Sequence, residues 1–395
     1  MRLTLFLLLA IAPFCALAQE TIPIRVINNA VLVPVKINDR SLNFLLDTGS
    51  DGTAIDPATA TTLRLPQQQT KMRIQKNFRE LVVDVTEADP IRIGSTDFHH
   101  VELAEINLMP LSKALGTGVD GVLGNDILEQ FTFKLNYSRQ TLLVGPLPKL
   151  GTLGRSTVLR RFRGQFLISI ALVSVPTELV LDTGANSTNL SWTTWERLTR
   201  VWTPKEIVEG IARAGNPTSP AILVCFPLLR LGNMTLKDQA VRAQQKSDEG
   251  SFSSEDFGGI LGSDILQQFE ITFNLKNNTI FLKPDTEYKR DPFRYVTIGV
   301  QIAKNDEGMV QIMSVWKDSP AARAGFQPGD LIKAVDGQPM ESLSLEQVLS
   351  KLHAKEGTAL RLAIERNAKL STIMVQTRSL LCTHDRPRSK GRSSK

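Results

Sequence analysis

Cysteine and histidine are scarce in this sequence of 395 residues, with three and four copies respectively. Cys225 and Cys382 lie outside the first 18 residues, in segments that we assign below to different modules. We therefore expect them to form neither a disulfide framework nor a metal site. The histidines show no zinc-ligand spacing, and the adjacent His99 and His100 are more typical of a solvated strand. The sequence indicates no metal and no cofactor.

Long apolar runs are missing except at the start of the chain. The run Leu3–Leu17 follows the basic Met1–Arg2 and leads into Ala18, which is typical of an export signal (1–18) cleaved near that residue. An uncleaved anchor is the alternative, but about 15 apolar residues fall short of the roughly 20 that span a bilayer. Lipidation of Cys15 is disfavoured because bulky Phe14 precedes it. We expect an exported protein, periplasmic or secreted, without stable membrane insertion after signal cleavage.

A strong excess of one charge is also missing from most of the chain. The formal net charge is +6, but five basic side chains and one acidic side chain lie in the segment 383–395. The remainder is close to neutral, so nucleic acid is not indicated as a partner. We expect residues 383–395 to form a basic disordered tail, with contact to an anionic surface as the alternative.

An internal repeat determines the predicted domain organisation. Gly121–Val144 and Gly259–Leu282 align at an offset of 138 residues, with 10 of 24 positions identical. Phe44–Ile55 and Leu179–Leu190 align at an offset of 135, which implies a three-residue insertion in the second copy. We therefore predict two tandem lobes, 21–144 and 157–282, joined by a Pro/Gly-rich linker.

Each lobe is predicted to form a small, mainly β, barrel-like unit. Apolar and β-branched runs flank short turn signals, which predicts hairpins at Val31–Leu46 around Asn38-Asp39 and at Phe166–Leu181 around Ser174–Pro176. Short helices are predicted after the N-cap Asp56 and in two segments that each begin with a capping residue, Asn125–Phe131 and Ser263–Phe269.

The candidate chemistry lies in two tripeptides, Asp47-Thr48-Gly49 and Asp182-Thr183-Gly184, each directly after an apolar strand. One Asp-Thr-Gly is a weak signal, but two at equivalent places in a repeat are a strong one. A strand that ends in Asp at the margin of a core raises the pKa of the carboxyl through desolvation. If the lobes pack about a pseudo-twofold axis, Asp47 and Asp182 face each other and share one proton.

Such a pair can supply both an acid and a base. The ionised carboxylate deprotonates a water molecule, and the protonated carboxyl donates to the scissile carbonyl oxygen. This predicts direct attack by water without a covalent intermediate. A duplicated β protein whose Asp-Thr-Gly turns only cap strands is the alternative.

A second motif, an apolar dipeptide between glycines, follows in each lobe and ends at Gly124 and at Gly262. Together the two motifs resemble retropepsin-like aspartic peptidases of the pepsin superfamily, and each lobe resembles one subunit of that homodimer. The resemblance covers about 21–282. It implies that Asp47 and Asp182 are catalytic, that Thr48 and Thr183 brace the interface, that Gly49 and Gly184 contact substrate backbone, and that Gly124 and Gly262 pack behind the catalytic loops.

The chain departs from this family in two places. The expected flaps, 71–85 and 208–223, contain no tyrosine. The arginine that often follows the second glycine motif in viral members is replaced by Asn125 and Ser263.

The segment 296–381 has no counterpart in the lobes and is predicted as a separate α+β module. Its stretch Ser319–Ile332, followed by Val335-Asp336-Gly337, resembles a PDZ domain of bacterial periplasmic proteases. The resemblance implies that the backbone around Ile298, Gly299 and Val300 captures a peptide C-terminus beside the helix at 345–353. A rigid appendage or dimer contact is the alternative.

The fold class predicted from the sequence is mainly β: two acid-protease lobes followed by a PDZ domain. The predicted function is that of an exported aspartic endopeptidase acting on proteins or peptides, with the PDZ domain binding C-terminal peptides for recruitment or regulation. A catalytically silent peptide-binding or scaffold protein is the alternative.

Overall fold

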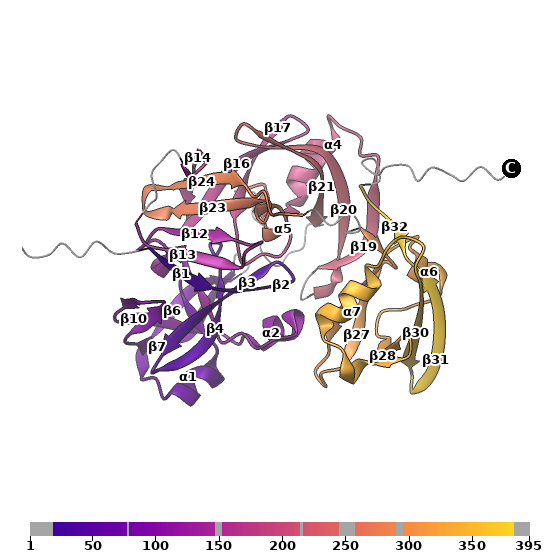
Figure 1. Cartoon of the computed structure of the whole chain (residues 1–395), viewed down its shortest axis with the longest axis horizontal. Helices are drawn as coiled ribbons and strands as arrows, with labels where there is room; N and C mark the ends of the chain where they lie inside the picture. Colours follow the sequence, from indigo (N-terminus) through magenta and orange to yellow (C-terminus); the bar gives the residue numbers. More distant parts are fainter. Residues whose placement is uncertain are drawn as a thin grey trace, which may run out of the picture.

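The computed structural model describes residues 19–76, 79–146, 152–213, 216–244, 257–289 and 295–382 and is mainly β, as predicted (Figure 1). The predicted export signal 1–18 and basic tail 383–395 lie outside these ranges. Across the described ranges, no helix has both the length and the apolar character needed to cross a membrane.

The first repeat contains thirteen short or medium strands and three helices. In chain order they are β1 (Glu20–Pro23), β2 (Arg25–Ile27), β3 (Ala30–Ile37), β4 (Arg40–Leu46), β5 (Ala54–Ile55), α1 (Pro57–Leu63), β6 (Gln67–Lys76), β7 (Arg79–Ala88), β8 (Ile91–Ile93), β9 (Thr96–Phe98), β10 (Val101–Glu105), α2 (Met109–Leu115), β11 (Gly121–Leu123), α3 (Asn125–Leu128), β12 (Phe133–Asn136) and β13 (Thr141–Val144).

The second repeat follows the same general order with longer strands in its middle part. Its elements are β14 (Arg155–Val158), β15 (Arg160–Phe162), β16 (Gln165–Leu172), β17 (Val175–Leu181), β18 (Asn189–Leu190), α4 (Trp192–Thr199), β19 (Ile207–Arg213), β20 (Asn216–Leu231), β21 (Met234–Gln244), β22 (Gly259–Leu261), α5 (Ser263–Leu266), β23 (Phe269–Asn274), the 3-10 turn η2 (Leu275–Asn277) and β24 (Thr279–Pro284).

The two repeats are joined by a shared sheet as well as by the chain. Each has a curled sheet of its own, and a six-stranded sheet in the order β1-β13-β12-β23-β24-β14 takes three strands from each repeat. One apolar core runs through both repeats and includes the stacked rings of Phe133 and Phe273, 4.6 Å apart. The predicted lobes therefore do not have separate cores, and their relation by a pseudo-twofold axis stays a prediction.

Local sequence signals account for the hairpins and caps of the repeats. The turn Asn38-Asp39 has both φ angles positive, at 48° and 59°, and it joins β3 to β4 as predicted. Asp56 caps α1 by accepting a hydrogen bond from the backbone N–H of Ala58, also as predicted. The helices predicted from Asn125 and Ser263 are shorter than expected, and neither residue is the cap. The N-caps are Gly124 and Gly262, with no side-chain cap, because both side chains are used elsewhere.

The third module has its own apolar core. It consists of β25 (Val296–Thr297), β26 (Val300–Lys304), β27 (Val310–Val315), α6 (Pro320–Arg323), β28 (Leu331–Val335), β29 (Gln338–Pro339), the 3-10 turn η3 (Met340–Ser342), α7 (Leu345–Leu352), β30 (Ala359–Arg366), β31 (Lys369–Gln376) and β32 (Arg378–Ser379). β25 and β26 are separated at Gly299, which has a φ of 87°. β25 pairs with β32, whereas β26 forms one edge of the main sheet.

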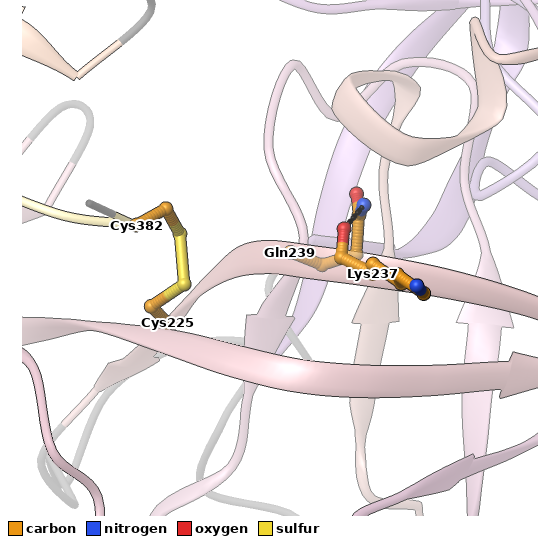
Figure 2. Close-up of a disulfide and its surroundings, with 4 residues drawn as sticks. All are labelled: Cys225, Lys237, Gln239 and Cys382. Carbon is orange, nitrogen blue, oxygen red and sulfur yellow. Dashed lines mark hydrogen bonds between the residues drawn. A yellow bond between two sulfur atoms is a disulfide. The ribbon is translucent and has the colours of Figure 1, made fainter. Parts of the chain in front are cut away.

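The expectation that Cys225 and Cys382 do not pair is wrong. They form a disulfide with a Cα–Cα distance of 5.4 Å across a sequence separation of 157 (Figure 2). The chain after β31 returns through β32, which places Leu381 and Cys382 in an apolar cluster with β20 and with Trp316. Assignment of the cysteines to different modules excluded a pairing within one module, but it did not exclude a bond between docked modules.

Candidate active site

The two Asp-Thr-Gly segments begin where buried strands end. β11 runs parallel to β4 and β22 runs parallel to β17, so each apolar dipeptide between glycines lies beside the strand that leads to an aspartate. The backbone N–H of Asp47 donates to the carbonyl of Leu123 at 3.1 Å, and that of Asp182 donates to Leu261 at 3.1 Å. Both segments are therefore held by matching hydrogen bonds to the strand behind them.

Thr48 and Thr183 join the two segments through reciprocal hydrogen bonds. Each hydroxyl accepts from the backbone N–H of the other threonine at 3.1 Å. Each hydroxyl also donates across to the opposite strand, from Thr48 to the carbonyl of Leu181 at 2.7 Å and from Thr183 to that of Leu46 at 2.8 Å. Both threonines have no exposed surface, so this four-bond arrangement fixes one segment against the other.

The same arrangement brings the two carboxyl groups together. They hydrogen bond to each other, and both aspartates are half-buried. The backbone N–H of Gly49 donates to Asp47 at 2.9 Å, and that of Ala185 donates to Asp182 at 2.8 Å. Residues 135 positions apart thus form one compact acidic pair.

Burial and mutual repulsion set the protonation of this pair. Burial and the adjacent charge of Asp182 raise the pKa of Asp47 well above its usual range. Burial also raises the pKa of Asp182, although the backbone hydrogen bond from Ala185 opposes the rise. Two carboxyls in contact retain one proton between them over the pH range where isolated carboxyls are ionised.

The third position of each tripeptide must be glycine because no side chain fits there. A Cβ atom on Gly49 would lie 2.6 Å from Cγ of Asp182, and one on Gly184 would lie 2.4 Å from Cγ of Asp47. Each glycine therefore accommodates the carboxyl of the opposite segment. Neither has a positive φ, so close approach explains the residue type.

Gly124 and Gly262 also allow close backbone contact. A Cβ atom on Gly124 would lie 2.3 Å from the carbonyl carbon of Gly52, and one on Gly262 would lie 2.5 Å from that of Ser187. Each glycine thus packs against the chain just after an Asp-Thr-Gly segment, and its place behind a catalytic loop stays a prediction.

The sequence reasoning missed a supporting set behind each segment. Asp126 accepts hydrogen bonds from the hydroxyl and the N–H of Thr53 at 2.6 and 3.0 Å, and Asp264 accepts the equivalent pair from Thr188 at 2.7 and 2.8 Å. All four residues occupy matching repeat positions with the same residue type in both copies. Asp does not favour strands, so the identity of these polar residues in both copies could have indicated a supporting role from the sequence alone.

Asn125 and Ser263 have a further role that capping rules did not indicate. The Asn125 amide donates to the carbonyl of Thr48 at 3.0 Å, and the Ser263 hydroxyl donates to that of Thr183 at 3.0 Å. Ser263 also hydrogen bonds to the hydroxyl of buried Tyr137 at 2.8 Å. Both residues thus hold the segment in front of them, although their chemistry differs.

The site is electrostatically unequal on its two sides. Asp51 follows the first tripeptide by two residues, and the equivalent position holds Asn186. Asp51 is exposed as a residue, but neighbouring atoms desolvate its carboxyl and raise its pKa to about 6; the positive charge of Arg161 opposes the rise, and the charge of Asp47 adds to it. Arg161 in turn pairs with Glu129 at 2.6 Å.

The segments predicted as flaps are antiparallel hairpins. β6 pairs with β7, and β19 pairs with β20. The turn residues 77–78 and 214–215 lie outside the part of the chain that the structure describes.

The residues predicted to bind a peptide in the third module lie at the start of its edge strand. Ile298 and Val300 have buried side chains that pack in the module core with Val348 of α7. The N–H of Gly299 donates to the hydroxyl of Thr297 at 3.2 Å. Only the backbone of this turn and the free edge of β26 are thus suited to bind a peptide.

The histidines and cysteines offer no convincing metal centre within the described ranges. His99 and His100 are exposed and pair with Asp89 and Glu87, as expected of a solvated pair. Glu206 lies close to both sulfur atoms of the disulfide, but sulfurs bonded to each other are not available as thiolate ligands.

Comparison with known proteins agrees with this architecture. Residues 33–127 match the family model described as aspartyl protease, and residues 311–366 match the model described as PDZ domain. The chain carries both domains. The aspartyl protease match includes the first Asp-Thr-Gly segment and β11, and the PDZ match begins within β27 and ends with β30.

Curated relatives share a smaller part of the chain. Probable CtpA-like serine proteases of Staphylococcus haemolyticus and Staphylococcus saprophyticus are 38% and 35% identical to it over 82 residues. A protein with the same name in Staphylococcus aureus strain COL is 29% identical over 82 residues. The match spans 21% of this chain and 16% of each relative.

Proposed function

We propose that the protein is an exported aspartic endopeptidase whose PDZ domain binds C-terminal peptides. The contact between the half-buried carboxyls of Asp47 and Asp182 carries this proposal. The reciprocal threonine hydrogen bonds and the two glycines support it, because they hold that contact in place. A pseudo-twofold relation between the repeats is part of the proposal.

The chemistry follows from the shared proton. One carboxyl of the pair carries the shared proton and donates it to the carbonyl oxygen of the scissile amide. The other carboxyl is ionised and removes a proton from the attacking water, while the backbone N–H groups of Gly49 and Ala185 hold Asp47 and Asp182 in place. The tetrahedral diol then collapses: the carboxyl that took the water proton gives it to the leaving nitrogen, and the other carboxylate removes a proton from a diol hydroxyl. The pair holds one proton throughout and ends with it on the starting carboxyl.

The similarity to CtpA-like serine proteases bears on the catalytic type. A match over 16% of those relatives does not transfer a whole-protein mechanism to this chain. A serine nucleophile requires a base within hydrogen-bond reach, whereas two coupled carboxyls already supply an acid and a base. We therefore assign peptide hydrolysis here to the aspartates.

Export is supported by two independent features. The first 18 residues have the composition of an export signal. The disulfide between Cys225 and Cys382 is of the kind that persists in oxidising compartments.

Cleavage of denatured casein at mildly acidic pH tests the proposal. Asp47→Asn and Asp182→Asn are each expected to lower the rate by about 10²–10⁴-fold. The surface variant Asp97→Asn, which removes a charge paired with Arg92, serves as the matched control and keeps the wild-type rate. A serine-directed sulfonyl fluoride is expected to leave the wild type active.

Three results would contradict the assignment. Full activity in either site variant would exclude the aspartate pair as the catalytic centre. Inactivation by the sulfonyl fluoride, with both site variants active, would favour a serine mechanism. A folded wild type that binds but never cleaves peptides would favour the silent peptide-binding alternative.

A further inference from the structure

The PDZ domain is docked on both repeats, and the two contacts differ in kind. Its contact with the second repeat is strong: the disulfide joins it to β20, and the backbone N–H of Lys317 donates to the carbonyl of Glu209 in β19 at 2.9 Å. The Lys317 ammonium also pairs with the Glu209 carboxylate at 2.9 Å. Trp316 and Leu381 add an apolar contact to the same hairpin.

Its contact with the first repeat involves the segment 109–116, which comprises α2 and its C-cap Gly116. α2 contacts the edge strand β26, and Figure 1 shows α2 on the side of the first repeat that faces the PDZ domain. Lys113 pairs with Asp306, just beyond the end of β26. A Cβ atom on Gly116 would lie 3.2 Å from Cβ of Leu345, the first residue of α7. One segment thus touches both β26 and α7, the two walls between which a peptide would bind.

The position of this contact defines which end of the groove is closed. A C-terminal carboxylate captured by the backbone at 298–300 requires the rest of the peptide to run along β26 toward Lys304. β26 has five residues, so a bound chain pairs along it for about five residues at roughly 3.3 Å each. Beyond that point the chain meets Lys113 and Gly116. A short peptide fits, whereas the tail of a protein collides with α2.

Both contacts of the PDZ domain connect to the hairpins that we expect to cover the catalytic cleft. Leu108 and Leu115, at the two ends of the α2 region, share an apolar cluster with Met72 and Val83 of the β6–β7 hairpin. In the contact with the second repeat, Trp316 of the PDZ domain shares another apolar cluster with Val208 of β19. The docked PDZ domain therefore contacts the α2 region, which packs against the β6–β7 hairpin, and it also packs against β19. It restrains both hairpins at the same time.

We propose that segment 109–116 is an autoinhibitory latch, which closes the upstream end of the PDZ groove and is released when the C-terminal chain of a protein binds there. Because the disulfide keeps the PDZ domain on β20, release separates it from the first repeat only. The two hairpins are then no longer connected through the domain, and the cleft opens to substrate. This regulation rests on the proposed peptidase function, although the latch contact itself does not.

A covalent lock on the latch tests the inference in the oxidised protein without the predicted export signal 1–18. In the double variant Lys113→Cys/Asp306→Cys, a short bismaleimide bridges α2 to the PDZ domain. Because Cys15 is removed with residues 1–18 and Cys225 is bonded to Cys382, only the two introduced thiols react. The matched control is the same variant with each thiol capped by N-ethylmaleimide. Neither position belongs to the catalytic machinery.

Two readouts separate the latch from the peptidase. Amide hydrogen exchange in β26 is expected to be at least fivefold slower in the bridged protein than in the capped protein, whether or not casein is cleaved. Casein cleavage is expected to be at least fivefold slower in the bridged protein. A mixture of decapeptides with free, apolar C-terminal residues should speed cleavage by the wild type severalfold and leave the bridged protein unchanged.

Equal β26 exchange in bridged and capped protein would overturn the latch itself. Unequal exchange with equal casein cleavage, or a wild type that the decapeptides do not stimulate, would overturn its control of the cleft. Loss of casein cleavage in every form, wild type included, together with slower exchange in the bridged protein, would instead count against the peptidase and leave the latch supported.

Discussion

The carboxyl group of Asp182 lies where the side chain of residue 49 would begin. A Cβ atom on Gly49 would be 2.6 Å from Cγ and 2.7 Å from Oδ2 of Asp182. The reciprocal relationship holds between Gly184 and Asp47. The third residue of each tripeptide is therefore as important for the acidic pair as the aspartate itself, because it determines whether the two carboxyls can meet.

Gly49→Ala and Gly184→Ala are expected to separate the acidic pair without unfolding the protein. The added methyl group displaces the opposite carboxyl, so casein cleavage should fall at least a hundredfold, while overpacking costs about 1–3 kcal/mol of stability. Gly52→Ala is the matched control, because a Cβ atom there meets nothing within 4 Å. Activity in Gly49→Ala close to that of Gly52→Ala would refute the predicted crowding.

Thr48→Val is expected to destabilise the junction of the two repeats. The change removes the bond to the carbonyl of Leu181 and leaves the N–H of Thr183 without its acceptor. Each unpaired buried group costs about 1–3 kcal/mol, which urea unfolding measures. Thr48→Ser keeps the hydroxyl and should recover most of the loss, whereas Thr62→Val, at an exposed helical site, should change little. Equal stability of the Val and Ser variants at position 48 would contradict this account.

The stability of the protein is expected to fall with rising pH because of Asp47. Its pKa is raised in the folded state, so the unfolded chain loses this proton first as the pH rises above about 4. The folded state is then penalised by about 1.4 kcal/mol for each unit of the rise, and fully so above the folded pKa. Below the unfolded pKa both states are protonated and the penalty vanishes.

Thermal unfolding of Asp47→Asn against wild type measures this effect. The variant should be more stable than wild type at pH 7, and the difference should shrink as the pH approaches 3. A variant that is equally or less stable than wild type at pH 7 would mean that burial does not disfavour the ionised carboxyl.

Removal of the disulfide is expected to loosen the PDZ domain and leave the catalytic pair in place. Cys382→Ser opens a covalent loop of 157 residues, for which chain entropy predicts a loss of up to about 4–5 kcal/mol. Unfolding in urea should then show the PDZ domain melting before the repeats. The control is the reduced wild type, which should behave in the same way; a single unchanged transition in both would argue against a stabilising bond.

The sequence was sufficient for features set by local chemistry or by repetition. The turn at Asn38-Asp39, the cap at Asp56 and the strands that lead to Asp47 and Asp182 each follow from a short pattern. The repeat indicated that the two aspartates are equivalent, which a single tripeptide does not.

Features that depend on packing between distant segments were not accessible in this way. No local pattern indicates that Cys382 returns to β20, because that contact follows from how the PDZ domain docks. Asn125 has the residue type of a helix cap, yet tertiary contact directs its amide to Thr48. The contact of Gly116 with Leu345 likewise depends on the arrangement of modules.

A double-mutant cycle on the acidic pair tests the central claim most directly. The rates of casein cleavage are measured for wild type, Asp47→Asn, Asp182→Asn and the double variant, with circular dichroism confirming that all four are folded. If the two carboxyls act as one proton-sharing unit, each single change already removes the unit, and the double variant is no slower than either single one. Losses that multiply in the double variant, or a single variant that keeps most of the wild-type rate, would contradict the account.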